Sequence, residues 1–303
     1  MSKLPVPRPL VPGSPAPRPR AAGGSERRRF VSRSRLPLSG WIAGGVVVLS
    51  VASALAPGIF APHDPFAVDP ATAFAPPTPE HPFGTDDSGR DVLSRTIYAA
   101  RTSLTIGIVA TVAGLALGTI LGALAGGSRG RALAPLRFAM DRLIEALFSF
   151  PGMLLALLLI AVQGPGTGTV IVAVALSTAP GYARMVRGGV RQTLSAGYVD
   201  AARLQGDSAL RLWLRRVLPG ALRPVLVLAT LGVGHAVVLA AALGFLGLGS
   251  PPPAPEWGAM LNAGRPYVTK APWLTLFPGL AILTLGVATT VLGRALEQRG
   301  RYQ

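Results

Sequence analysis

Six long apolar stretches constrain the fold of this chain more than any other feature. They lie near residues 39–61, 102–126, 138–162, 167–186, 224–247 and 273–293. A bilayer core of about 30 Å requires roughly 20 apolar helical residues, so each stretch is long enough to cross a membrane. The stretches are apolar all round, whereas the helices of a large soluble core would keep a polar face. We therefore predict an all-α membrane protein with six transmembrane helices.

The basic residues are placed unevenly between these stretches. Of the 29 Lys and Arg residues, only Arg90, Arg95, Arg101, Arg265 and Lys270 fall on one side of the membrane. Because positively charged loops stay in the cytoplasm, we predict a multi-pass protein of the cytoplasmic membrane with both termini cytoplasmic. The same distribution accounts for most of the net charge of +16, so we do not expect nucleic-acid binding.

Composition divides the chain into segments. Residues 1–37 mix Pro, Arg, Gly and Ser without apolar periodicity, which predicts a disordered, basic, proline-rich cytoplasmic head. The segments that follow are an anchor helix at 38–61, an extracytoplasmic segment with an interfacial helix at 62–101, a five-helix core at 102–297 with a long cytoplasmic loop at 187–222, and a cytoplasmic tail at 298–303.

The cytoplasmic loop between the fourth and fifth spans is the most informative stretch. It carries, at defined spacing, Asp200, Ala201, Ala202, Gly206, Leu218 and Pro219. The small alanines let another protein surface approach, the glycine permits a bend between two short helices, and the proline ends the second. This spacing resembles the signature loop of bacterial ABC import permeases, which usually has Glu in place of Asp200. The resemblance implies an ATPase-coupling loop, whereas the spacing alone is equally compatible with an ordinary amphipathic loop helix.

Three further stretches resemble the C-type permease of dipeptide, oligopeptide and nickel importers. They are HPFGTDDSGRDVLSRTIYAARTSL at 81–104, ALGFLGLGSPPPAPEWGAML at 242–261 and FPGLAIL at 277–283. Arg142, Glu145 and FSFPGMLLAL belong to the same pattern, and the resemblance covers about residues 80–290. The tail at 293–297 departs from the acidic pattern of the family. The chain is thus similar to an inner membrane component of a binding-protein-dependent transport system, which implies a type I ABC importer permease core.

The resemblance implies a transport subunit rather than an enzyme. Such a permease translocates peptides or nickel-type solutes together with a homologous second permease, two ABC ATPase subunits and an extracytoplasmic substrate-binding protein. Glu256 and Trp257 are candidates for contact with that binding protein. We expect no cofactor on this chain, and ATP and Mg²⁺ on the ATPase subunits, because Lys3 and Lys270 do not follow glycine as a phosphate-binding loop requires.

The alternative function is a proton-coupled secondary transporter, which requires ionisable residues along the spans. His235 is the only such side chain deep in a predicted span, and it is our candidate for the transport pathway. Glycines recur every four residues at Gly114, Gly118, Gly122 and Gly126, which places them on one helix face. That face predicts close helix packing, and a sliding seam for alternating access is the other interpretation.

The extracytoplasmic segment is rich in side chains that can bind metals. They are His63, Asp64, His81, Asp86 and Asp87. Their spacing fits no recognised metal site, so we expect none. The two neighbouring aspartates, together with Arg90 and Asp91, are instead expected to form caps and ion pairs that open the interfacial helix.

Overall fold

The computed structural model describes residues 38–127 and 134–300, which belong to one compact unit beginning at Leu36. The predicted disordered head at 1–37 and the last residues of the predicted tail lie outside the described residues. The elements are α1 (Leu38–Leu55), α2 (Pro57–Phe60), η1 (Pro70–Thr72), α3 (Val92–Gly127), α4 (Ala134–Ser149), α5 (Gly152–Gln163), α6 (Thr167–Leu194), α7 (Gly197–Leu204), α8 (Ala209–Leu212), the π-helical turn η3 (Trp213–Val217), α9 (Leu218–Phe245), α10 (Trp257–Gly264), η4 (Arg265–Tyr267) and α11 (Trp273–Gly300).

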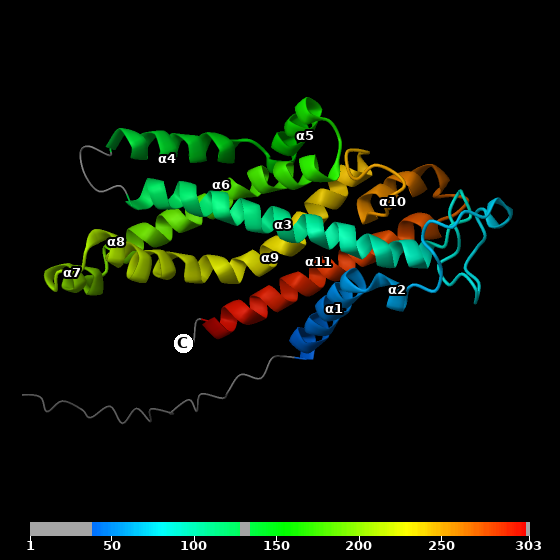
Figure 1. Ribbon diagram of the computed structural model, residues 1–303, viewed down its shortest axis with the longest axis horizontal. Helices are drawn as coiled ribbons and strands as arrows, with labels where there is room; N and C mark the ends of the chain where they lie inside the picture. The colour runs from blue at the N-terminus through cyan, green and yellow to red at the C-terminus, as the bar shows by residue number, and fades with distance from the viewer. Residues whose placement is uncertain (1–37, 128–133, 301–303) are drawn as a thin grey trace, which may run out of the picture. The chain divides into compact units, whose positions relative to one another are not determined.

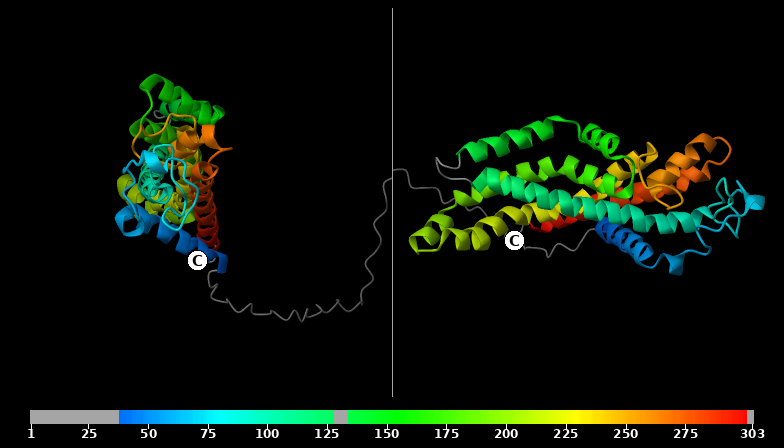
Figure 2. Two further views of the ribbon diagram at one scale, coloured as in Figure 1. Left: turned by 90° about the vertical axis from the view of Figure 1, so that its right-hand side faces the viewer. Right: turned by 45° about the horizontal axis from the view of Figure 1, so that its top comes forward.

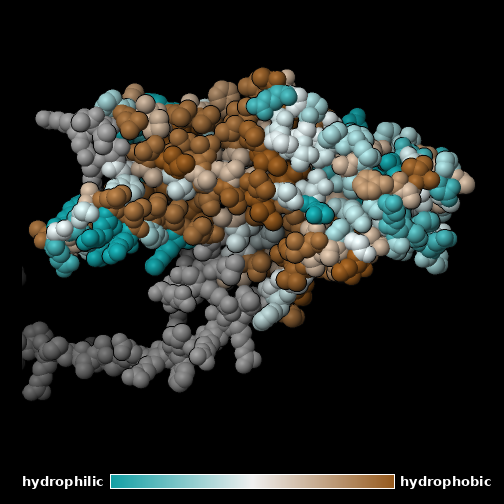
Figure 3. Space-filling view, viewed as in Figure 1, coloured by the Kyte–Doolittle hydropathy of each residue, from teal (hydrophilic) through white to brown (hydrophobic). Residues whose placement is uncertain are grey.

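The predicted all-α membrane fold is confirmed. Five of these helices, α1, α3, α6, α9 and α11, contain segments long and apolar enough to cross a bilayer. The helices α3, α6 and α9 lie side by side along much of their length (Figures 1 and 2). We call the end of the bundle that carries α7 and α8 the α7 end, and the opposite end the α10 end. A band of hydrophobic residues lies between the more hydrophilic ends (Figure 3), as expected for a protein whose middle contacts lipid.

The third predicted span is not the single helix expected at 138–162. It is a pair of helices, α4 and α5, bent by 93° at their junction. The bend falls at Pro151, which cannot donate a backbone hydrogen bond and restricts the residue before it. The sequence therefore predicted the apolar length of this span but not the bend within it.

The predicted interfacial helix is also wrong as a separate element. Helix α3 begins at Val92 and continues without a break through the apolar stretch to Gly127. The expected cap is present, since the Ser94 N–H donates to Asp91 Oδ2 over 2.7 Å. The expected ion pair is present too, with Arg90 Nε at 2.7 Å from Asp86 Oδ2. Nothing between Val92 and Arg101 breaks the helix, so the first turns simply extend the span.

The four-residue glycine repeat of α3 forms the predicted close helix packing, and its partner is α6. A Cβ at Gly118 would lie 2.7 Å from the Ala179 carbonyl oxygen, and one at Gly122 would lie 2.4 Å from that of Ala183. Gly114 and Gly126 approach α6 in the same way, one step further along in each direction. The backbones of α3 and α6 therefore lie closer together than a residue with a Cβ atom at these positions would allow. The two helices run parallel and pack as one unit.

Candidate functional site

Residues 195–217 connect α6 to α9 and form the α7 end; we call them the connecting segment (Figure 1). The predicted loop at 187–222 is shorter in the structure, because α6 continues to Leu194 and α9 starts at Leu218. One face of the segment is buried. Val199, Leu212 and Val217 join a hydrophobic cluster with side chains of α6 and α9. The connecting segment is therefore packed firmly onto the two long helices that flank it.

The other face of the connecting segment exposes large apolar side chains. Leu204 is 90% exposed and Leu210 is 70% exposed, and Tyr198 and Leu214 are also exposed. Asp200 lies on this surface, with its carboxylate 2.7 Å from Arg203 Nη1. Ala201 is exposed as well, but Ala202 is buried against the hydrophobic cluster. The prediction that both alanines face another protein is therefore wrong for Ala202, which packs inside this chain.

Gly206 forms the bend between α7 and α8, as predicted. Its φ of +84° lies in the left-handed region that glycine adopts without strain. Two residues missed at the sequence level complete the turn. Asp207 lies 3.7 Å from Arg211 and 3.6 Å from Arg216, and the Ser208 hydroxyl accepts a hydrogen bond from the Arg211 N–H. The order Gly-Asp-Ser, a flexible residue followed by two capping residues, is the signal that could have indicated them.

Pro219 does not end the second short helix. It lies in the first turn of α9, directly after Leu218 and the π-helical turn. The residues before it are already helical, and the π-helical turn changes the hydrogen-bond pattern just where the proline has no N–H to donate. The connecting segment thus leads into α9 without a loop.

Helix α4 is joined to α6 by charged side chains that the sequence reasoning missed. Asp141 Oδ1 lies 2.7 Å from Arg187 Nη1, and its Oδ2 lies 3.0 Å from Arg191 Nη2. The Arg184 guanidinium stacks 3.6 Å above the ring of Phe148. By contrast, Arg142 and Glu145, which carried part of the resemblance, pair with each other on the surface of α4. The Asp141 cluster fixes α4 beside the α7 end of α6.

His235 lies on an open groove between α9 and α11. The groove is lined by Leu231, Gly234, His235, Val238, Ile282, Leu283, Gly286, Val287, Thr290, Val291 and Arg294. His235 is exposed there, and Arg294 adds a second ionisable side chain. The groove is therefore mainly apolar and carries two ionisable side chains.

Glu256 and Trp257 are buried, with exposures of 1% and 3%. Glu256 caps α10 by accepting hydrogen bonds of 2.8 Å from the N–H groups of Gly258 and Ala259, and the Trp257 indole donates to the Thr96 carbonyl over 2.9 Å. These contacts tie α10 to α3. The structure therefore contradicts the prediction that either side chain contacts a binding protein at the surface.

Burial sets the ionisation of Glu256. Desolvation raises the pKa of its carboxyl group, and the hydrogen bonds from Gly258, Ala259 and Ser103 oppose that rise in pKa because they favour the ionised form. The Ser103 hydroxyl approaches to 3.4 Å, which is long for such a bond. Glu256 is thus a structural cap held in a desolvated position.

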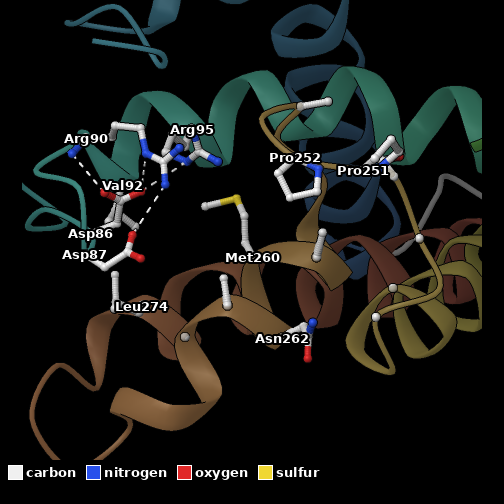
Figure 4. Close-up of a pocket in the computed structure, with 18 of the residues that line it drawn as sticks. Asp86, Asp87, Arg90, Val92, Arg95, Pro251, Pro252, Met260, Asn262 and Leu274 are labelled. Carbon is white, nitrogen blue, oxygen red and sulfur yellow. Dashed lines mark hydrogen bonds and ion pairs between the residues drawn. The ribbon is translucent and has the colours of Figure 1, made fainter. Parts of the chain in front are cut away.

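A cavity of about 350 Å³ opens at the α10 end, between the start of α3 and α10 (Figure 4). One wall carries Asp86, Asp87, Arg90 and Arg95, and the other carries Pro251, Pro252, Met260 and Asn262. The charged wall is internally paired, since Arg95 Nε lies 3.6 Å from the same Asp86 oxygen that binds Arg90. The cavity therefore combines a fixed set of charges with an apolar, proline-stiffened wall.

Comparison with known proteins identifies the family of this chain. Residues 97–302 match the family described as the binding-protein-dependent transport system inner membrane component. The chain belongs to this family. It is 39% identical over 229 residues to the dipeptide transport system permease protein DppC of Alkalihalophilus pseudofirmus, covering 76% of this chain and 74% of that protein. The suspected resemblance is thereby confirmed.

Other relatives of this permease carry similar descriptions. The di/tripeptide transport system permease protein DppC of Pseudomonas aeruginosa is 44% identical over 71% of this chain and 69% of its own length. The glutathione transport system permease protein GsiD of Pectobacterium atrosepticum is 40% identical over 73% of this chain and 72% of its own length.

Solved structures agree on the fold. An inward-facing structure of the MetNI methionine ABC transporter superposes with a TM-score of 0.55 at 20% identity, covering 68% of this permease and 95% of that chain. An amino acid ABC transporter solved with histidines gives a TM-score of 0.54 at 16% identity, covering 68% and 94%. At these identities the similarity supports the fold alone, and it confirms the importer-permease architecture.

Family membership settles the class of function. The protein is a multi-pass permease subunit of an ATP-driven importer, and it is a transport subunit rather than an enzyme. Membership implies an ATPase and a substrate-binding protein as partners. The proton-coupled secondary transporter considered from the sequence is therefore not supported.

Proposed function

We propose that this permease imports peptides together with a homologous second permease, and that two ATPase subunits dock on the connecting segment. The peptide cargo is supported by the names of the relatives, which transport dipeptides, di/tripeptides and glutathione. ATP and Mg²⁺ are bound by the ATPase subunits. The substrate-binding protein delivers the peptide at the α10 end.

The exposed apolar face of the connecting segment is the observation that carries the docking proposal. Leu204, Leu210 and Leu214 project from short helices whose opposite faces are buried. This surface lies beyond the membrane-spanning length of α6 and α9, next to several arginines, so lipid does not cover it. Apolar side chains at such a position favour burial by another protein, because covering them removes their surface from water. Asp200 lies on the same surface and is proposed to contact the ATPase.

The orientation follows from the charges. The connecting segment and its flanks at 184–223 carry half of the arginines of the described residues, whereas the α10 end carries fewer basic residues. The positive-inside bias supports a cytoplasmic α7 end and cytoplasmic termini. The ATPases and the binding protein would thus act at opposite ends of the bundle.

The packing of the connecting segment supports a coupling mechanism. Its buried side chains share one hydrophobic cluster with Val186 and Val190 of α6 and Val225 of α9. A displacement imposed on the exposed face is therefore passed to both helices rather than absorbed by a loop. Because the glycines of α3 pack directly on α6, a displacement of α6 is passed on to α3 as well. Closure of the ATPases would favour an outward-facing state if the segment makes different contacts in the two states.

The groove that contains His235 and Arg294 is proposed to face the second permease. Its lining is mostly apolar and lies on an uncovered side of α9 and α11. A second permease would enclose it and leave a pathway between the two subunits. His235 is the side chain we propose to line that pathway.

A pair of matched substitutions tests the docking proposal. Leu204→Asp places a charge on the exposed face of the connecting segment, and Val68→Asp places one at an exposed apolar position at the α10 end. Burial of a leucine contributes about 1.5–3 kcal/mol, so Leu204→Asp should weaken ATPase binding at least about 10-fold. Val68→Asp should leave binding unchanged.

The readouts are recovery of ATPase subunits with the affinity-tagged permease and uptake of a labelled dipeptide by membrane vesicles. Both should fall for Leu204→Asp at unchanged permease abundance. Equal ATPase recovery from both variants would contradict docking at the connecting segment. Normal docking with no peptide uptake by the wild-type complex would contradict the proposed cargo instead.

A further inference from the structure

The chain contains three histidines, and the fold brings two of them together at the α10 end. His63 follows α2, His81 lies in the turn before Thr85, and Asp91 caps α3. His81 Nδ1 lies 3.0 Å from Asp91 Oδ1, and His63 Nδ1 lies 3.9 Å from Asp91 Oδ2. The potential ligand atoms of the three residues all lie within 4.8 Å of one another.

One nitrogen atom of this cluster, His63 Nδ1, is buried and has no hydrogen-bond partner among the described residues. A buried polar atom without a partner is destabilising, and such atoms are rare in folded proteins. This nitrogen faces a carboxylate oxygen that is slightly too far away to bond. An ion between the two would give His63 Nδ1 a partner and add a contact to Asp91 Oδ2, which already accepts from the Ser94 N–H.

The donor set indicates the chemistry of that ion. Two imidazole nitrogens and one carboxylate oxygen suit a divalent transition cation, and zinc accepts three such ligands plus a water. In a tetrahedral zinc site the ligand atoms lie about 3.3 Å apart, given zinc–ligand distances of about 2.0 Å. The pair formed by His81 and Asp91 is close to this spacing at 3.0 Å, and zinc binding would draw in the third ligand atom, which lies within 4.8 Å of the other two.

The surroundings hold the ligands in place. The Ser94 N–H donates to Asp91 Oδ2 over 2.7 Å, and the Ser94 hydroxyl accepts from the His63 backbone N–H over 3.0 Å. Arg95 Nη1 donates to the Pro65 carbonyl over 2.9 Å, which fixes the chain just after His63. Outer contacts of this kind orient ligands and raise metal affinity. The neighbouring Asp86 is occupied by Arg90 and does not compete.

We propose that His63, His81 and Asp91 bind one zinc ion, which clamps the segment after α2 onto the start of α3. The ligands come from three parts of the extracytoplasmic segment and meet only in the folded protein. The site is separate from the connecting segment and from the His235 groove. It therefore stabilises the α10 end of the permease whatever solute is transported.

The third histidine gives a matched control for the test. Full-length permease in detergent, purified with a tag that contains no histidine, is stripped of metal and titrated with Zn²⁺ against a chromophoric chelator. Wild type and His235→Gln should each bind one equivalent. His63→Gln and His81→Gln should lose at least the 10–100-fold in affinity that follows from disturbing a metal site. Bound Zn²⁺ should also raise the thermal unfolding midpoint of wild type and His235→Gln only.

X-ray absorption of the zinc-loaded wild type gives a measurement that does not depend on variants. It should show a first shell of nitrogen and oxygen with the outer scattering of two imidazoles. Stoichiometry well below one equivalent, an unchanged affinity in folded His63→Gln, or a shell without imidazole would each overturn the proposal. In that case the cluster would be reduced to the hydrogen bond between His81 and Asp91.

Discussion

The close contact between α3 and α6, which we call the α3–α6 seam, predicts both the sign and the size of a change in the free energy of unfolding. A Cβ at Gly122 would lie 2.4 Å from the Ala183 carbonyl oxygen and 2.8 Å from Val186 Cβ, whereas ordinary contact begins near 3.4 Å. Because the nearest atom belongs to the backbone, Gly122→Ala must push the helices apart by about 1 Å. Such overpacking costs about 1–3 kcal/mol, and the better helix propensity of alanine returns at most about 1 kcal/mol. We expect a net destabilisation of up to about 2 kcal/mol.

Gly188 of α6 supplies the matched control. It is also a helical glycine, but a Cβ there would meet nothing within 4 Å. Gly188→Ala should therefore keep only the propensity gain and stabilise the protein by about 0.5–1 kcal/mol. Equilibrium unfolding in mixed SDS and detergent micelles, followed by circular dichroism, measures both free energies of unfolding. If Gly122→Ala proved as stable as Gly188→Ala, the close backbone contact inferred for this seam would be refuted.

Three further predictions concern other parts of the permease. Since burial raises the pKa of Glu256 above its ordinary value of 4.5, the folded state holds this proton more tightly than the unfolded state. Stability should thus fall as pH rises from about 4.5 through the raised pKa, and Glu256→Gln should remove that slope from thermal unfolding curves followed by tryptophan fluorescence. Gly206→Ala introduces about 1–2 kcal/mol of left-handed strain but no clash, so it should reduce ATPase-coupled uptake while membrane insertion stays normal. Asp141→Asn weakens one partly buried and one exposed ion pair and should lower the free energy of unfolding by about 1 kcal/mol, whereas Glu145→Gln, in an exposed pair, should change it by less than about 0.5 kcal/mol.

Several features of the candidate site followed from local sequence. The bend at Gly206 needed only a residue free to adopt positive φ between two short helical segments. The capping and pairing of Asp91 and Asp86 needed only neighbours three or four residues away. Interactions of this range repeat in any helix terminus, so residue order is enough to predict them.

Other features of the site could not be predicted, because they depend on which side chains of a helix are buried against the rest of the protein. Ala202 was predicted to contact a partner and is buried, while Asp207 went unnoticed and completes the turn. Glu256 and Trp257 looked like surface residues of a proline-rich loop, yet α10 folds back onto α3 and buries both. No periodic pattern marks such a fold-back, because its contacts join residues more than 150 positions apart.

The sequence by itself determined the membrane class, the positions of five spanning helices and the glycine face of α3. Lipid cannot satisfy a backbone polar group, so about 20 apolar residues in a row must form a helix, and glycines four residues apart must share a face. Only the tertiary structure decided the bend at Pro151, the partners of the glycine face and the meeting of His63, His81 and Asp91. These depend on how distant segments pack, and their energy comes from contacts that no local pattern encodes.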